Sequence, residues 1–204
     1  MKIKLERLMY FLLLAPPAPL AGFMGGWWLA YSLLPEKWIA SGAISGLLLG
    51  ILADIFIIKY LVDRAHALSA IFWAVVILFY AVGLFGFFMG VPILNIGLAL
   101  PVGFLTGSRL AYRQASNSKV QATAHRISLI NTGLLSLACL ASAFFALSSP
   151  STPADLQGML ALPFPVTPLM IRGFILVGGV VILVINYFLT LLAVRFTYRL
   201  LSTT

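Results

Sequence analysis

Charged residues are scarce in this sequence, and acidic residues are the scarcest. Charged residues make up 9% of the 204, and five Asp and Glu stand against thirteen Lys and Arg. Because a soluble domain usually has about 25% charged residues, this composition excludes an ordinary water-soluble fold. The hydrophobic fraction is 62% and the mean hydropathy is +1.08. The sequence therefore predicts an integral membrane protein.

Cysteine and histidine are also rare, with one and two residues. The single Cys139 excludes an intramolecular disulfide, a CxxC redox pair and a thiolate metal cluster. His66 and His125 fall in segments that we expect to be cytoplasmic loops, so neither is placed to act as a base inside the membrane. The chain also lacks a His-Glu-x-x-His sequence, a Walker sequence and paired intramembrane carboxylates. We therefore expect no enzyme activity, no metal and no cofactor.

Long apolar runs, in contrast, are abundant. Six are long enough to cross a hydrocarbon core of roughly 30 Å as helices. We expect an all-α, polytopic bundle of six transmembrane helices, forming one domain over residues 1–204. The spans lie at about 8–34, 38–62, 67–89, 92–109, 127–147 and 172–195.

Three segments of this layout need separate arguments. The first 22 residues imitate a signal peptide, but the apolar character continues to Leu34, so we expect the segment to be retained. Segment 109–126 is polar and is expected to be a loop, with helical extensions allowed at both ends. Segment 148–171 is rich in proline and is expected to be an extracytoplasmic loop. Thr152, Pro153 and Asp155 resemble a helix start, which predicts a short interfacial helix there.

Basic residues segregate strongly across the six spans. One side has eleven and the other has only Lys37 and Arg172; the eleven are Lys2, Lys4, Arg7, Lys59, Arg64, Arg109, Arg113, Lys119, Arg126, Arg195 and Arg199. By the positive-inside rule, both termini are expected to be cytoplasmic, in a cell membrane. This explains the net charge of +8 without nucleic acid as a partner, and it favours contact with anionic lipids.

Asp54 is the acid that lies inside an apolar run. Gly42, Gly46, Gly50 and Asp54 recur every four residues, which puts them on one stripe of the second span. Small residues at this spacing let a neighbouring helix approach closely, so Asp54 should face protein and not lipid. It is either a proton, cation or substrate site or a helix-packing acid, and the sequence leaves both open.

Three prolines interrupt the first span close to the depth of Asp54. Pro16, Pro17 and Pro19 remove backbone donors, so we expect a kinked or broken helix. Unwound backbone of this kind lines the binding sites of some transporters, but a kink that only shapes packing is the alternative.

Small and polar residues mark the later spans as well. In the fourth span Asn95, Ala99, Gly103 and Gly107 form a second packing stripe, expected against the second or third span. Thr106, Asn131 and Thr190 are expected near the depth of Asp54, and Asn186 near mid-membrane. Each is either a site residue or a hydrogen-bonding residue between helices.

These features favour two functions. The first is a small transporter, or the membrane subunit of one, with Asp54 as the proton- or cation-responsive group and other membrane subunits as partners. Six spans in 204 residues with both ends inside are similar in size and topology to the substrate-binding subunits of energy-coupling-factor vitamin transporters and to small amino-acid exporters. The second is a non-catalytic scaffold or assembly protein whose glycine stripes are subunit contacts. The environment of Asp54 is expected to separate the two.

Overall fold

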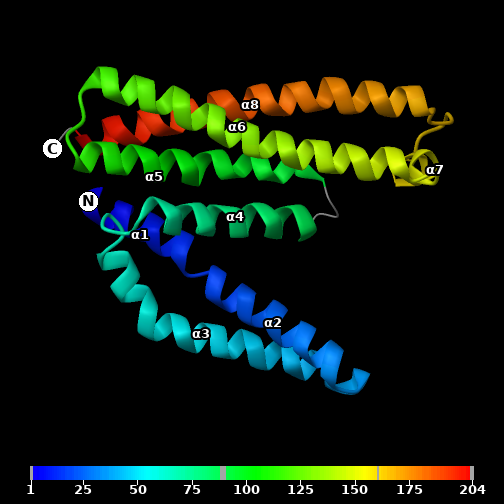
Figure 1. The fold of residues 1–204 in the computed structure, drawn as a ribbon, viewed down its shortest axis with the longest axis horizontal. Helices are drawn as coiled ribbons and strands as arrows, with labels where there is room; N and C mark the ends of the chain where they lie inside the picture. The colour runs from blue at the N-terminus through cyan, green and yellow to red at the C-terminus, as the bar shows by residue number, and fades with distance from the viewer. Residues whose placement is uncertain (1, 88–90, 160, 203–204) are drawn as a thin grey trace. The chain divides into compact units, whose positions relative to one another are not determined.

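The computed structural model describes residues 2–87, 91–159 and 161–202, and within these ranges it contains helices and no strand (Figure 1). Six helical stretches of the described chain are long and apolar enough to cross a bilayer: Glu6–Leu33, Glu36–Asp63, Ala70–Phe87, Pro92–Tyr112, Asn117–Ser148 and Pro168–Ser202. The predicted all-α, six-span membrane protein is thereby confirmed. The chain forms two compact units, Met1–Tyr80 and Ala81–Thr204, which we describe in turn.

The first unit begins with a helix that breaks at the prolines. Its elements are α1 (Lys2–Leu14), α2 (Pro17–Leu33), the 3-10 turn Glu36–Trp38, α3 (Ile39–Asp63) and the first part of α4 (Ala70–Phe87). Only Ala15 and Pro16 separate α1 from α2, because Pro16, Pro17 and Pro19 cannot donate to the carbonyls one turn earlier. The predicted break in the first span is confirmed, and it leaves backbone acceptors at membrane depth.

The α2–α3 hairpin is held by glycines on both helices. A Cβ on Gly46 would overlap the carbonyl oxygen of Gly22, and a Cβ on Gly26 would overlap that of Gly42. Gly50 would carry its Cβ 2.6 Å from the Cα of Pro19. The predicted stripe of Gly42, Gly46 and Gly50 therefore does bring a neighbouring helix to backbone contact, and that helix is α2.

The other end of the first unit is tied together by polar and aromatic contacts. Glu6 on α1 contacts His66 in the turn after α3, with 3.2 Å between Oε1 and Nε2. Tyr10 is 2% exposed and packs its ring 5.3 Å from His66 and 5.6 Å from Trp73. Arg7 pairs with Asp63 at the end of α3. These contacts fix α1 to the turn between α3 and α4.

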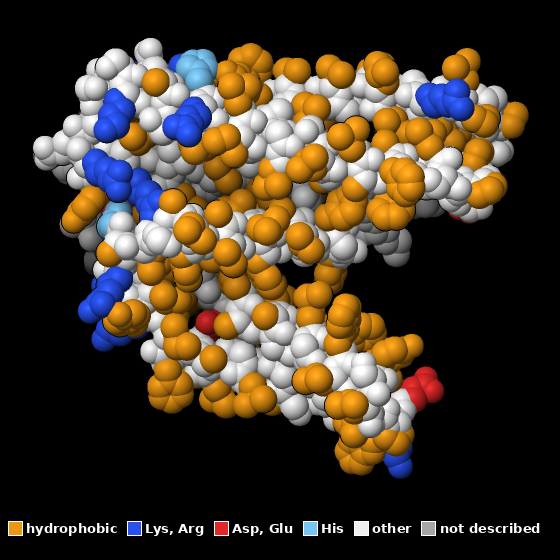
Figure 2. Space-filling view, viewed as in Figure 1, with side chains coloured by type: hydrophobic (Ala, Val, Ile, Leu, Met, Phe, Trp, Pro, Cys, Tyr) orange, Lys and Arg blue, Asp and Glu red, His pale blue; other side chains and the backbone are white. Residues whose placement is uncertain are grey.

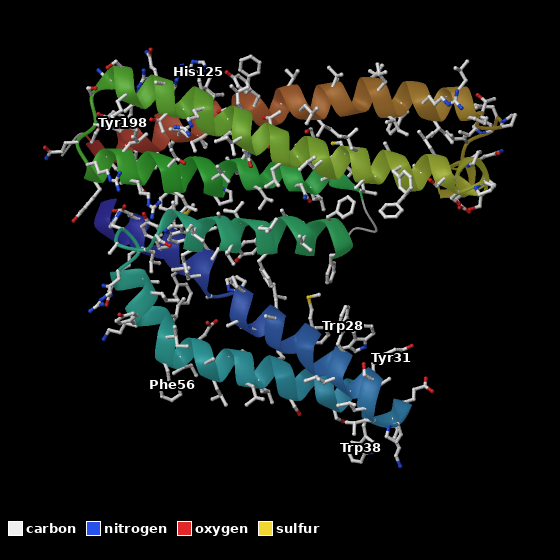
Figure 3. The ribbon with its side chains drawn as sticks, in the orientation of Figure 1. Trp28, Tyr31, Trp38, Phe56, His125 and Tyr198 are labelled. Atoms are coloured by element: carbon white, nitrogen blue, oxygen red, sulfur yellow. The ribbon has the colours of Figure 1, made fainter. Side chains whose placement is uncertain are left out.

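Aromatic side chains cover the opposite, less basic end of the first unit. Trp28, Tyr31 and Trp38 are all more than half exposed, and Figure 3 shows them along the end of the hairpin. Phe56, 80% exposed, points away from α2 on the outer side of α3 (Figure 3). Tryptophan and tyrosine at a helix end are typical of the level where lipid head groups meet the hydrocarbon, so this end lies at an interface.

The second unit is a bundle of three long helices. Its elements are the 3-10 segment Pro92–Leu98, α5 (Ala99–Tyr112), α6 (Asn117–Ser148), α7 (Thr152–Met159) and α8 (Pro168–Ser202), after the last turns of α4. Helices α5, α6 and α8 lie side by side (Figure 1). The predicted short helix after Thr152 is present. Met89, the predicted end of the third span, lies outside the described residues.

Two boundaries differ from the sequence prediction. Helix α6 begins at Asn117, ten residues before the predicted fifth span, so His125 lies in a helical extension of the kind allowed for segment 109–126. Only residues 113–116 separate α5 from α6. Helix α8 runs from Pro168 to Ser202, beyond the predicted 172–195 at both ends. The predicted spans end where the sequence becomes polar. A helix can nevertheless extend beyond the hydrocarbon core, until a residue in its sequence breaks it.

The second glycine stripe packs against a different helix from the one expected. A Cβ on Gly103 would lie 3.0 Å from the main-chain nitrogen of Val194, and a Cβ on Gly107 would lie 2.7 Å from the carbonyl oxygen of Val194. For these two glycines the prediction of the second or third span was wrong, because their partner is α8. Val194, which is fully buried, is the centre of this contact. Asn95 of the same stripe does contact the third span, since its Nδ2 donates to the Ala81 carbonyl of α4 at 3.0 Å.

The turn between α5 and α6 is fixed by a helix-end motif without glycine. Gln114 has a positive φ of 48°, and its N–H donates to the carbonyl of Ala111. The Ala115 N–H donates to the carbonyl of Leu110 at 3.0 Å. This is the hydrogen-bond pattern of a Schellman cap. Leu110 and Ala115 also belong to the buried cluster that joins α5, α6 and α8, so packing holds Gln114 in place.

Candidate functional site

The proline break of the first unit is completed by a hydroxyl from another helix. Pro17 has no N–H, so the carbonyl of Leu13 lacks the donor that an unbroken helix would supply. The Tyr80 hydroxyl of α4 donates to this carbonyl at 3.0 Å. An unpaired carbonyl is costly in hydrocarbon, which explains why a tyrosine stands here. The break is therefore a built polar position, formed by backbone and by a side chain from another helix.

Asp54 lies at the level of this break. Successive contacts between α2 and α3 pair Gly26 with Gly42, Gly22 with Gly46 and Ala18 with Gly50. One further step in this antiparallel register brings Asp54 opposite Leu14, next to the break. The side chain is partly buried and has no hydrogen bond or ion pair within the described chain.

Tyr80 interacts both with the helix break and with Asp54. Its hydroxyl, bonded to Leu13, is within range of the charge of Asp54. A carboxylate, a phenol and unwound backbone from three helices thus occupy one level of the first unit. Such a set can exchange a proton or hold a small cation, because it offers acceptor oxygens and one exchangeable hydroxyl.

The second unit contains a separate buried polar cluster between α6 and α8. Asn131 Nδ2 donates to Thr190 Oγ1 at 2.9 Å and to Asn186 Oδ1 at 3.3 Å. Asn186 Nδ2 donates to Thr132 Oγ1 at 3.3 Å, and the Thr190 hydroxyl donates to the Asn186 carbonyl at 2.8 Å. Asn186 and Thr190 are fully buried. We call these four residues the amide cluster; its members bond to one another across the helix interface.

Thr106 does not take part in these bonds. Its hydroxyl donates back to the carbonyl of Val102 in its own helix at 2.9 Å. Ser128 lies one turn before Thr132 on α6, fully buried, and its hydroxyl oxygen has no partner among the described residues. The amide cluster therefore has one unsatisfied polar neighbour along α6.

Of the five predicted binding residues, Asn131, Asn186 and Thr190 lie together and Thr106 stands apart on α5. Asp54 belongs to the first unit, so a polar layer shared by both units stays a prediction. Sequence reasoning missed Tyr80. The signal available was that Tyr80, unlike the phenylalanines around it, brings a hydroxyl into an apolar run that must find a partner.

Within the described part of the chain, no group of three or more His, Cys, Asp and Glu residues is close enough to share a metal ion. In comparisons with known proteins, no family model, no curated protein and no solved structure matches this chain.

Proposed function

We propose that the protein is a small transporter, or the membrane subunit of one, in which Asp54 is the proton- or cation-responsive group. One observation carries the proposal: an acid without a partner in the described chain stands at a helix break whose carbonyl is bonded by Tyr80. Broken helices and intramembrane acids are typical of sites where ions and solutes cross a membrane. The amides and hydroxyls of the second unit would support that unit's packing.

A non-catalytic scaffold or assembly protein is the second candidate. The amide cluster favours it, because amides that bond to one another have little left to offer a solute. Under this proposal Asp54 serves to pack helices, and other membrane subunits bind the apolar exterior.

The proposed topology places both termini in the cytoplasm of a cell with this protein in its plasma or inner membrane. Basic residues at one end of each unit support it: Arg7, Lys59 and Arg64 in the first, and Arg109, Arg113, Lys119, Arg126, Arg195 and Arg199 in the second. Figure 2 shows blue side chains gathered near the α5–α6 turn. Green fluorescent protein fused to either terminus should fluoresce, and alkaline phosphatase should be inactive at both. Phosphatase activity at one terminus only would refute the six-span topology.

The coupling role of Asp54 is tested by Asp54→Asn. Purified protein is reconstituted in liposomes that contain a pH-sensitive dye, a potassium diffusion potential is imposed, and proton uptake is measured with panels of amino acids and vitamins outside. We expect wild type to show uptake that depends on one of these solutes. Asp54→Asn should reduce it to the level of empty liposomes, because an amide keeps the shape and cannot exchange a proton.

The matched control is Asp155→Asn, which makes the same change at an exposed acid in α7. It should leave uptake unchanged. Tyr80→Phe should lower uptake while the protein stays folded, since one hydrogen bond contributes about 1 kcal/mol. Solute-dependent uptake that survives Asp54→Asn would remove Asp54 from the mechanism and favour the scaffold.

A further inference from the structure

The second unit has a cavity of about 230 Å³ where α6 begins and α8 ends. Six residues line it, three from each helix: Asn117, Val120, Gln121, Arg195, Tyr198 and Arg199. We call it the Arg195 cavity. Its volume is below the roughly 300–1,000 Å³ of pockets for drug-sized molecules, so it suits a compact group.

The floor of the Arg195 cavity is rigid. Val120 is 5% exposed and belongs to the buried cluster that also contains Ala115 and Val194. The Tyr198 hydroxyl donates to the Ala115 carbonyl at 2.6 Å, and Figure 3 shows Tyr198 beside the α5–α6 turn. These contacts are made by the chain's own residues, so little further ordering is needed for a group to bind in the cavity.

Arg195, which lines this cavity, has an unsatisfied hydrogen-bond donor. Its Nε is buried and has no partner in the described chain. Its Nη2 lies 3.4 Å from His125 Nε2, and His125 Nδ1 lies 2.7 Å from the Tyr187 hydroxyl. Since arginine can only donate, His125 Nε2 must accept and Nδ1 must carry the hydrogen. The contact with His125 therefore orients the guanidinium, and the buried Nε–H of Arg195 has no acceptor in the described chain.

The one acidic side chain in the sequence of the second unit is far from this donor. Residues 81–204 contain a single acid, Asp155, in α7 beyond the far end of α6. Six basic residues lie near the cavity end of the unit: Arg109, Arg113, Lys119, Arg126, Arg195 and Arg199. Basic side chains are thus concentrated at the end of the second unit where the cavity lies.

The cavity also lies at the depth of lipid head groups. Arg172 and Arg195 are the basic residues nearest the two ends of the apolar stretch of α8, and at 1.5 Å per residue they are about 35 Å apart. This matches a hydrocarbon core of roughly 30 Å, so Arg195 is near the boundary where phosphates lie.

We propose that the Arg195 cavity binds a phosphate group, held by Arg195 and Arg199 with Asn117 and Gln121 as polar partners. The phosphate belongs either to an anionic phospholipid head group or to a phosphate-bearing solute. Guanidinium groups donate pairs of hydrogen bonds to phosphate oxygens, and both Arg195 and Arg199 line the cavity. This site is independent of Asp54 and of transport.

The test is a titration of the detergent-solubilised full chain, followed by native mass spectrometry. The probes are short-chain phosphatidylglycerol, short-chain phosphatidylcholine and inorganic phosphate. We expect saturable binding of phosphatidylglycerol or phosphate, and none of phosphatidylcholine. Arg195→Gln and Arg199→Gln should each weaken it about fivefold, since a basic residue near an anionic head group contributes on the order of 1 kcal/mol.

Matched controls separate the cavity from general charge. Arg126→Gln removes a basic residue from the same end of α6 outside the cavity, and Arg172→Gln removes one from the other end of α8. Both should bind as wild type does. Arg199 is exposed, so Arg199→Gln should fold even if Arg195→Gln does not.

The two sources of phosphate give different results. Phosphatidylglycerol binding that inorganic phosphate does not displace would identify a lipid site, and equal affinity for inorganic phosphate would identify a solute site. The proposal is overturned if neither probe binds, or if Arg126→Gln weakens binding as much as Arg199→Gln. Loss of transport in Asp54→Asn leaves this result unchanged, so the two proposals fail separately.

Discussion

Gly46→Ala is expected to lower the free energy of unfolding by about 3 kcal/mol, the upper part of the range for overpacking a tight contact. The new methyl group would overlap the carbonyl oxygen of Gly22, which is backbone and cannot rotate away as a side chain could. Helices α2 and α3 would have to separate along the stripe, and the contacts at Gly26 and Gly50 would weaken together. The measurement is an unfolding titration of the purified protein in mixed micelles, followed by far-ultraviolet circular dichroism.

Gly25→Ala is the matched control for this change. Gly25 lies on α2 between the same glycines, but a Cβ there would meet no atom within 4 Å. The control should therefore be neutral or gain up to about 1 kcal/mol from helix propensity. Equal stability of Gly46→Ala and Gly25→Ala would contradict backbone contact between α2 and α3.

The glycine stripes show how far the sequence alone could lead. Spacing by four residues correctly predicted that Gly42, Gly46 and Gly50 admit a close neighbour. For Gly103 and Gly107 the same reasoning held, but the expected neighbour was wrong. A stripe of small residues predicts that another helix packs closely against it, but it does not identify that helix. The partner α8 offers Ala193 and Val194, which in sequence look like any other apolar residues.

Polar residues were located by sequence but their bonding was not. Asn131 and Thr190 were predicted to share a depth, and Asn186 was predicted near mid-membrane, both from the rise per residue. Whether they face one another depends on the rotation of α6 and α8 about their axes, and depth does not determine rotation. The Arg195 cavity could not be predicted either. Asn117 and Arg195 are far apart in the chain, and His125 was assigned to a loop.

Asn186→Asp is expected to destabilise the protein by about 3 kcal/mol at neutral pH, although it preserves the shape of the side chain. Asn186 is fully buried in the amide cluster, and an ionised carboxylate there has no basic partner in that cluster. A charged group at the centre of a transmembrane helix costs roughly 2.5 to 3.5 kcal/mol. The change also removes the donor that bonds Thr132.

Asn186→Leu separates the cost of the charge from the cost of the lost hydrogen bonds. Leucine removes the amide bonds to Asn131 and Thr132, at about 0.6 kcal/mol for each bond between helices, and it introduces no charge. The leucine variant should therefore be more stable than the aspartate variant by about 2 kcal/mol. Acidification should narrow this gap, because a protonated carboxyl can again donate to Thr132. An aspartate variant that is as stable as wild type at neutral pH would mean that water reaches Asn186, and the amide cluster would then be open to a solute.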